Sequence, residues 1–320
     1  MGNVYASSAK KPADPSYTVM QQDLYTDSEK GEHVENPGSM EELHKKCKEI
    51  FPVNFEGAKI AVQKGLSNHF QISHSLNMSS ITPSGYRFGA TYVGTQQFGP
   101  GEAYPVLVGD IDPVGNLNAN IYHKFTESLI TRFQAQVQSS NFASQFIVDY
   151  KGKSYTTSLT VCNPDPVACT GVFVGHYLQN VYKNIDLGAE IAYQRSQQIP
   201  GNQIAVTSLA GRYTGGDFTL SGTVGLTGLH LCYYQKASNQ LQLGVEFETN
   251  FRVQEAVTSV GYQIDIPKAD LVFKGMVDSN WNVGATLDKK LFPMPFALTL
   301  SGMLNHQKNQ FRLGLGFIIG

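Results

Sequence analysis

The chain has 320 residues and a formal net charge of −2 at pH 7, and only 16% of its residues are charged, below the roughly 25% typical of soluble domains. A nearly neutral charge argues against a nucleic-acid partner, because proteins that bind nucleic acid are usually basic. The sequence contains no run of about 18 apolar residues, so it predicts no transmembrane helix. Residues 1–40 are too polar for a signal peptide. Neither absence excludes a membrane β-barrel, whose alternating strands average out in a hydropathy window.

Residues 1–38 lack hydrophobic periodicity and mix proline with Ser, Lys, Glu and Asp. Such a composition cannot bury enough apolar surface to fold. The sequence therefore predicts a disordered, cytosolic N-terminal tail over 1–38.

A short helix with its linker is predicted over residues 39–55. Ser39 and Glu42 have the spacing of a capping box, and Pro52 ends the pattern. One face of this helix is apolar: Met40, Leu43, Cys47, Ile50 and Phe51. A helix this short needs a surface to pack on. It is either an ordinary capping helix or a segment inside a pore, and periodicity alone does not separate the two.

Residues 56–320 show one alternating segment after another, and residues 129–137, 218–226 and 241–248 are clear examples. The segments and their turns repeat every 13–14 residues, on the order of the 9–11-residue strands that cross a bilayer plus short turns. This spacing predicts about 19 strands. Lipid cannot satisfy an open sheet edge, so such a sheet must close into a barrel. At this strand number the barrel has an aqueous lumen, which favours a channel.

The last ten residues form the clearest strand. Every odd position from 311 to 319 is apolar, and the chain stops at Gly320. An apolar strand of this kind is a poor free edge, so we expect it to pair with an earlier strand and close the barrel. Four residues in it fit the pattern polar-x-Gly-x-x-hydrophobic-x-hydrophobic, which resembles the C-terminal sorting signal of mitochondrial outer-membrane β-barrels: Arg312, Gly314, Phe317 and Ile319.

Motifs for catalysis or metal binding are missing from the sequence. It has no HExxH, no P-loop, no GxSxG and no Cys/His cluster with metal-ligand spacing. The eight histidines are dispersed. The four cysteines are scattered and are expected to be free thiols: Cys47, Cys162, Cys169 and Cys232. We therefore expect no enzymatic activity, no cofactor and no metal.

Acidic residues occur in pairs on the polar faces of the predicted strands. Asp110 and Asp112 lie two residues apart and should share a face, as should Glu246 and Glu248. A carboxylate facing lipid is costly, so we expect these groups, and Asp288, in the lumen. They either belong to a generally solvated lumen or form an acidic track for a positively charged passenger. Basic residues share the interior, so its charge is mixed: Arg132, Lys151, Lys236, Lys274, Lys290 and Arg312.

Several long stretches make the chain similar to the channel subunits of the mitochondrial outer-membrane protein-import translocase, from about Asn36 onward. These stretches are Lys64–Phe70, Thr91–Gly94, Pro105–Asp110, Ser208–Gly211, Tyr233–Ser238, Val245–Glu248 and Lys274–Trp281. The resemblance implies an all-β transmembrane barrel of 19 strands in the mitochondrial outer membrane. Its first and last strands would be parallel, and a helix near residues 40–51 would lie inside the pore.

The resemblance also implies partners and sites. Asp110 and Asp112 match an acidic patch on the import path, and Asp288 stands where the family usually carries Glu. Trp281 matches a position that contacts a single-pass receptor subunit, although an interfacial anchor fits it as well. Expected partners are precursor proteins with basic presequences, receptor and small single-pass subunits, membrane lipid and further copies of the barrel.

Together with the barrel pattern and the acidic pairs, the resemblance implies a protein-conducting channel for unfolded, presequence-bearing precursors. The alternative of the same architecture is a voltage-dependent anion and metabolite channel, which a basic lumen would favour and the acidic pairs disfavour. A soluble β-rich binding protein is a third reading. It predicts extraction from membranes at high pH, which an integral barrel should resist.

Overall fold

The structure is a computed structural model that describes residues 36–99, 101–138, 141–165, 169–197, 199 and 201–320. The tail expected over residues 1–38 therefore lies outside the described residues, apart from its last three.

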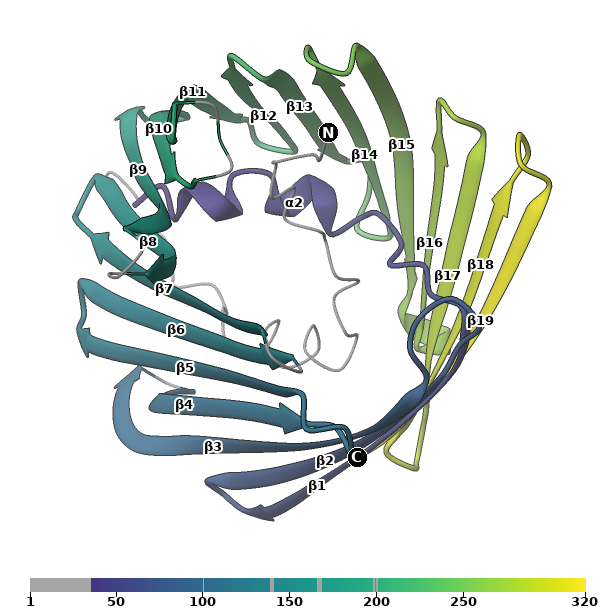
Figure 1. The fold of residues 1–320 in the computed structure, drawn as a ribbon. Coiled ribbons are helices and arrows are strands. Elements are labelled where there is room, and N and C mark those ends of the chain that lie inside the picture. The colour runs from purple at the N-terminus through teal and green to yellow at the C-terminus, as the bar shows by residue number, and fades with distance from the viewer. Residues whose placement is uncertain (1–35, 100, 139–140, 166–168, 198, 200) are drawn as a thin grey trace.

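Over the described residues the chain forms nineteen strands in a single closed sheet (Figure 1). Each strand pairs antiparallel with its neighbours in sequence, and β1 and β19 close the ring in parallel. The strands are β1 (Gly57–Ser67), β2 (Phe70–Met78), β3 (Gly85–Gly99), β4 (Glu102–Ile111), β5 (Leu117–Thr126), β6 (Leu129–Gln138), β7 (Asn141–Lys151), β8 (Tyr155–Asp165), β9 (Thr170–Tyr182), β10 (Ile185–Arg195), β11 (Gln203–Thr214), β12 (Phe218–Gly225), β13 (Gly228–Lys236), β14 (Leu241–Asn250), β15 (Glu255–Ile266), β16 (Leu271–Asp278), β17 (Asn282–Leu291), β18 (Phe296–Asn305) and β19 (Gln310–Ile319). This confirms the predicted fold class.

The parallel closure follows from the odd number of strands. In an up-and-down meander the first and last of an odd number run in the same direction, so they can only pair in parallel. The register aligns Gly57 with Gly314, Ile60 with Phe317 and Val62 with Ile319. The apolar end of the chain thereby gains a partner for its backbone groups, as its sequence required.

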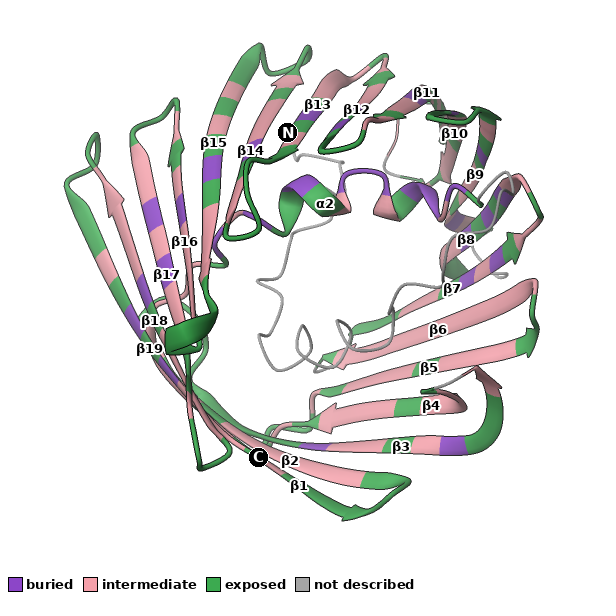
Figure 2. Cartoon of the chain, turned by 180° about the vertical axis from the view of Figure 1, so that it is seen from behind, coloured by how far each residue is buried: buried purple, intermediate pink, exposed green. Residues whose placement is uncertain are grey.

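Alternation along the strands gives the wall two different faces. On β19, Phe311, Leu313 and Leu315 are exposed on the outside, whereas Gly314 on the other face is buried. The same alternation recurs on β12, where Phe218 and Leu220 are exposed and Thr219 and Ser221 are buried. Figure 2 shows how burial varies along the other strands. The outer surface is apolar because it must meet lipid, and the inner surface carries the polar residues.

The N-terminal segment lies inside the barrel, where the described chain begins (Figure 1). It comprises a 3-10 turn, η1 (Met40–Glu42), and a single turn of α-helix, α2 (Lys45–Lys48). The predicted apolar face is confirmed, since four of its members are buried: Met40, Leu43, Cys47 and Ile50. Of the two readings of the helix, the segment inside the pore is the one that the structure shows.

The predicted capping box is wrong. The Ser39 side chain makes no cap hydrogen bond, and the helix is broken rather than continuous. Glu42 forms an ion pair with Lys45 instead, at 3.7 Å. The segment follows the curved wall and its side chains bind to that wall, so contacts with distant strands replace local capping.

Another short turn, η2 (Pro267–Ala269), connects β15 and β16. Among the described residues, no helix has the length and apolar character needed to cross a membrane.

Candidate functional site

The candidate site is the inner wall of the barrel together with the N-terminal segment bound to it. Met40 and Leu43 pack against Leu178 of β9 and Ala210 of β11. Ile50, further along the segment, approaches Gly244 of β14, where an added Cβ would lie only 3.2 Å from its Cδ1 atom. Apolar contacts therefore hold the segment against the strands from β9 to β14.

Arg132 anchors the start of the segment to β6 and β7. Its guanidinium lies 2.7 Å from the carboxylate of Asp149 and 3.0 Å from that of Glu41. Asp149 is only 4% exposed. A buried carboxylate is tolerable only when it is paired, so Arg132 serves both the wall and the segment.

A second arginine, on β11, also binds both a carboxylate of the wall and the N-terminal segment. Arg212 of β11 lies 2.7 Å from Asp186 of β10 and donates a hydrogen bond of 2.5 Å to the carbonyl oxygen of Pro37. Asn36 donates to the carbonyl oxygen of Gly152 at 2.7 Å. The segment is thus attached by polar contacts as soon as the described chain begins.

Helix α2 meets β12, β13 and β14. His44, at its N-terminal end, is hydrogen-bonded through Nδ1 to the hydroxyl of Ser221, at 2.8 Å. Burial, and then the charges of His230 and Lys48, lower the pKa of His44 to about 4, so its imidazole is neutral at pH 7. The Cys47 thiol donates to the carbonyl oxygens of Tyr233 and Val245.

The structure places Glu246 and Glu248 on the lumen side of β14, as expected. Glu246 lies 2.7 Å from His230 and 3.9 Å from Lys48 of α2. Glu248 lies 3.4 Å from His230, and its side chain is 53% exposed. Glu246 is therefore engaged with the bound segment, whereas Glu248 is open to the lumen.

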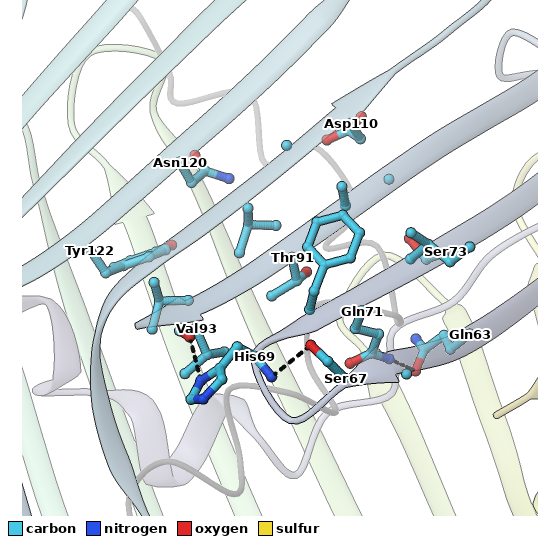
Figure 3. A pocket seen from close by; sticks show the side chains of 18 of the residues that line it. Gln63, Ser67, His69, Gln71, Ser73, Thr91, Val93, Asp110, Asn120 and Tyr122 are labelled. Carbon is cyan, nitrogen blue, oxygen red and sulfur yellow. Dashed lines mark hydrogen bonds between the residues drawn. The ribbon is translucent and has the colours of Figure 1, made fainter. Parts of the chain in front are cut away.

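Asp110 belongs to a different part of the inner wall, a hollow of about 400 Å³ over β1 to β5 (Figure 3). Its carboxylate lies 3.6 Å from Arg87 and accepts a hydrogen bond from Asn118 at 2.9 Å. Much of this lining is polar, and the polar side chains that Figure 3 labels are Gln63, Ser67, His69, Gln71, Ser73, Thr91, Asp110, Asn120 and Tyr122. Apolar side chains such as Val93, Val106 and Val108 share this lining, so the hollow offers both polar and apolar contacts.

Asp112 differs from Asp110 in that it belongs to a turn and not to a strand. It lies just beyond the end of β4, where its Oδ1 accepts from the backbone of Val114 and Asn116 and its Oδ2 accepts from the Asn116 side chain. These hydrogen bonds, above all those with Asn116, lower the pKa of Asp112. Asp278 makes the same contacts with Asn282 after β16. The spacing Asp-x-x-x-Asn is therefore a turn-closing device here.

Asp288 lies on β17 opposite Val272 of β16. Lys274, which lies opposite Thr286 and therefore on the same face of the sheet as Asp288, donates a 2.6 Å hydrogen bond from its ammonium to the Glu49 carbonyl oxygen. Lys274 thus identifies this face as the one that meets the N-terminal segment. Asp288 is on the lumen side. Its strand, β17, is several strands away in the sheet from β4, which carries Asp110.

Comparison with known proteins decides the family. The sequence profile of the family described as "Eukaryotic porin" matches residues 36–314. The chain belongs to the eukaryotic porin family.

Similar proteins share half of the sequence of this porin over most of its length. "Mitochondrial import receptor subunit TOM40 homolog 2" of Drosophila melanogaster is 52% identical over 341 aligned residues, covering 100% of both chains. "Mitochondrial import receptor subunit TOM40 homolog" of Xenopus laevis is 51% identical, covering 90% of this chain and 85% of its own. The Homo sapiens protein of the same name is 50% identical, covering 89% and 78%.

Trp281 of the porin lies in the turn between β16 and β17, not in a strand. Its backbone has a positive φ of 57°, and its indole is 62% exposed. The backbone N–H of Trp281 donates to the carbonyl oxygen of Asp278, and the backbone carbonyl of Trp281 accepts from the backbone N–H of His306. The Trp281 side chain is accessible in this turn, so both predicted roles, partner contact and interfacial anchor, remain compatible with its position.

The four residues of the predicted sorting pattern divide between the two faces of β19. Arg312 and Gly314 alternate with the outward residues, whereas Phe317 and Ile319 have the parity of the outer face and pair with β1. A Cβ added to Gly314 would lie 2.4 Å from the Phe55 carbonyl oxygen. The glycine of this pattern therefore also has a packing role in the folded barrel.

Gly314→Ala is expected to destabilise the folded porin by about 1–3 kcal/mol, the usual cost of overpacking. Gly302→Ala on the adjacent strand is the matched control, because the nearest atom to its added Cβ is 3.9 Å away. Denaturant unfolding of the refolded proteins, followed by circular dichroism, measures the difference. Equal unfolding midpoints for the two variants would show that the chain at Phe55 moves away from the added methyl group without loss of stability.

Sequence reasoning missed how the segment is held. Arg132 was expected in the lumen, but its partners Asp149 and Glu41 come from different elements, and Arg212 was not singled out. Arginine and aspartate on the inward faces of strands are the signal that could have found these anchors. It does not reveal which arginine meets which carboxylate.

Proposed function

We propose that this porin is a protein-conducting channel of the mitochondrial outer membrane that passes unfolded, presequence-bearing precursors. The observation that carries the proposal is half-identity, over most of the chain, to proteins named as mitochondrial import receptor subunits. The closed barrel with its polar inner wall supplies the conduit. These relatives are named as import receptor subunits, and we propose no catalytic role here.

The proposed mechanism is passive. A presequence is a basic amphipathic helix, and its positive face is drawn along carboxylates by several weak attractions, each easily released. Glu248 and Asp288 are the principal proposed contacts. Asp110 and Glu246 would also attract the positive face, but each already has a basic neighbour: Arg87 lies beside Asp110, and Lys48 lies beside Glu246. Asp112 contributes only at the end of the barrel wall, because its oxygens are committed to a turn.

The proposed setting is a translocase complex. Receptor and small single-pass subunits would contact the outer surface, with Trp281 as one contact, and further copies of the barrel would assemble beside it. The outward apolar faces of the strands supply the surface for lipid and for such subunits. The pattern Arg312, Gly314, Phe317 and Ile319 is proposed as the signal for insertion into the outer membrane.

Glu248→Gln combined with Asp288→Asn is expected to weaken block of the pore by a basic presequence peptide by about 2- to 30-fold. This range follows from 0.2–1 kcal/mol for each exposed ionic contact. Single-channel recording of the refolded protein in planar bilayers measures the block and the ion selectivity. Import of presequence cargo into mitochondria carrying the variant should slow in parallel.

Glu127→Gln combined with Asp217→Asn is the control, because it removes the same charge from exposed turns. It should leave block unchanged. Equal block by all three proteins would refute the acidic track. An anion-selective pore indifferent to the peptide would instead favour the metabolite-channel reading that porin architecture also permits.

A further inference from the structure

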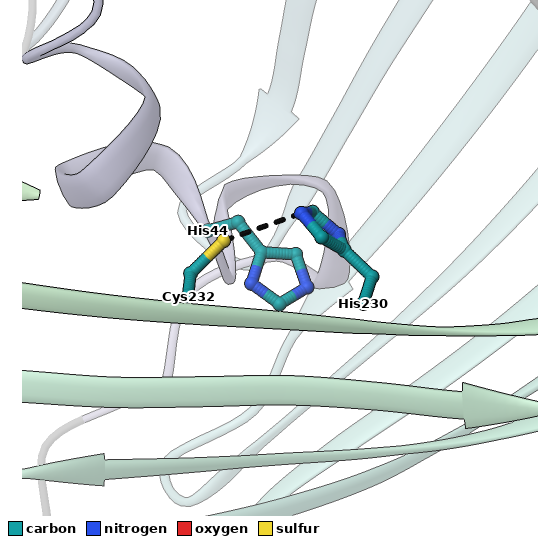
Figure 4. Close-up of side chains that lie close together, drawn as sticks. All are labelled: His44, His230 and Cys232. Atoms are coloured by element: carbon teal, nitrogen blue, oxygen red, sulfur yellow. Dashed lines mark hydrogen bonds between the residues drawn. The ribbon is translucent and has the colours of Figure 1, made fainter. Parts of the chain in front are cut away.

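Five potential metal ligands converge where helix α2 meets β13 and β14. The donor atoms of His44, His230 and Cys232 lie within 4.8 Å of one another (Figure 4). Those of His230, Glu246 and Glu248 also lie within 4.8 Å of one another. Sγ of Cys232 lies 3.3 Å from Nε2 of His230, and that nitrogen lies 2.7 Å from Glu246. His44 comes from the N-terminal segment, and the others come from the wall.

His44 supplies an independent indication of a ligand. The residue is only 9% exposed, and its Nε2 is buried with no hydrogen-bond partner. An unsatisfied buried polar atom is costly and calls for an explanation. Its Nδ1 is held by Ser221 at 2.8 Å. A second partner on the far nitrogen is how metal-ligating histidines are usually oriented, and the His44 and His230 rings pack with centroids only 4.2 Å apart.

We infer that His44, His230, Cys232 and Glu246 form a site for a divalent cation of the zinc type. Two imidazole nitrogens, a thiolate and a carboxylate oxygen are the donor set that Zn²⁺ accepts in tetrahedral coordination. Metal–ligand bonds of about 2.0–2.3 Å place tetrahedral donors roughly 3.3–3.8 Å apart. The Cys232–His230 pair already has this spacing, and the His230–Glu246 hydrogen bond must open slightly.

Binding of the metal ion would change the present interactions of Cys232 and Glu246. The Cys232 thiol loses its proton to solvent when it coordinates the metal. Lys48, 3.9 Å from Glu246, gives up part of that contact, and Glu248 remains beside the site to offset the added positive charge. Cys47 lies beside Cys232 and interacts with it, so a disulfide between them would remove the ligand. The metal would join the N-terminal segment to β13 and β14 and so fix its position in the lumen.

Titration of the refolded full chain with Co²⁺, in detergent and with a non-thiol reductant, tests the site directly. The expected result is saturation at one equivalent, with a thiolate-to-cobalt charge-transfer band and the intense visible bands of tetrahedral cobalt. Zn²⁺ should displace the Co²⁺ and should slow tryptic cleavage of the N-terminal segment at Lys45 and Lys48. Absence of the charge-transfer band in the wild-type protein overturns the proposal, whatever the variants do.

Cys232→Ser should abolish the charge-transfer band. Ser221→Ala, which removes only the support of His44, should weaken Co²⁺ affinity by roughly 10–100-fold. Cys162→Ser is the control, because that thiol is on β8, outside the cluster, and it should leave both unchanged. A band that survives in Cys232→Ser and disappears in Cys162→Ser would place the metal elsewhere and overturn the assignment.

Discussion

Arg132→Met is expected to lower the free energy of unfolding of the refolded barrel by roughly 3–5 kcal/mol, the cost of leaving a buried charge without its partner. Asp149 is the charge left behind, because it is almost fully buried against the inner wall. Glu41 loses the same partner but is more exposed. Denaturant unfolding in detergent micelles, followed by circular dichroism, gives the change.

Two further variants test the physical reason. Arg132→Met combined with Asp149→Leu should recover most of the loss, because apolar groups of similar size often replace a buried ion pair at little cost. Lys153→Met changes an exposed lysine in the turn after β7 and should have almost no effect. If the double variant is as unstable as Arg132→Met alone, the buried carboxylate is not the cause.

Leu178→Ala is expected to cost about 2–5 kcal/mol, the range for leucine truncation in a packed core. Leu178 is 0% exposed and lies under Met40 and Leu43 of the N-terminal segment. The cavity opens beneath the segment, so limited proteolysis should cut the segment faster than in the wild-type protein. Unfolding midpoints and cleavage rates together report stability and attachment.

Leu187→Ala on the neighbouring strand β10 is the matched control. Leu187 is exposed on the outer face, where lipid or detergent fills the space that truncation creates, so its loss should be smaller and the cleavage rate unchanged. Faster cleavage in Leu187→Ala than in Leu178→Ala would contradict the assignment of Leu178 to the segment's binding surface.

The position of the N-terminal segment has a direct consequence for passage through the pore. It occupies the side of the lumen near β9 to β14 and leaves the hollow over β1 to β5 on the other side (Figures 1 and 3). Glu248 lies beside the segment and Asp110 in that hollow. A proposed basic passenger would therefore meet carboxylates on two sides of a lumen that the segment narrows.

The sequence by itself determined the barrel. Alternation along the strand segments within residues 56–320 fixes which side chains face lipid, because a one-residue shift would turn every apolar side chain of a strand inward. The strand spacing predicted the count, and the apolar final strand required a partner. Met40, Leu43, Cys47 and Ile50 were recognisable as a buried face because helical spacing is a local property.

Only the tertiary structure decided which polar groups meet. Asp110 and Asp112 look equivalent in the sequence, yet one lies in the lumen and the other closes a turn, because the strand ends between them. His44 and Cys232 share no motif, since one lies at the N-terminal end of α2 and the other on β13, a strand far along the chain against which α2 packs. Polar contacts inside a barrel depend on curvature and on the path of the enclosed segment. Those properties belong to the closed sheet as a whole, and no local spacing encodes them.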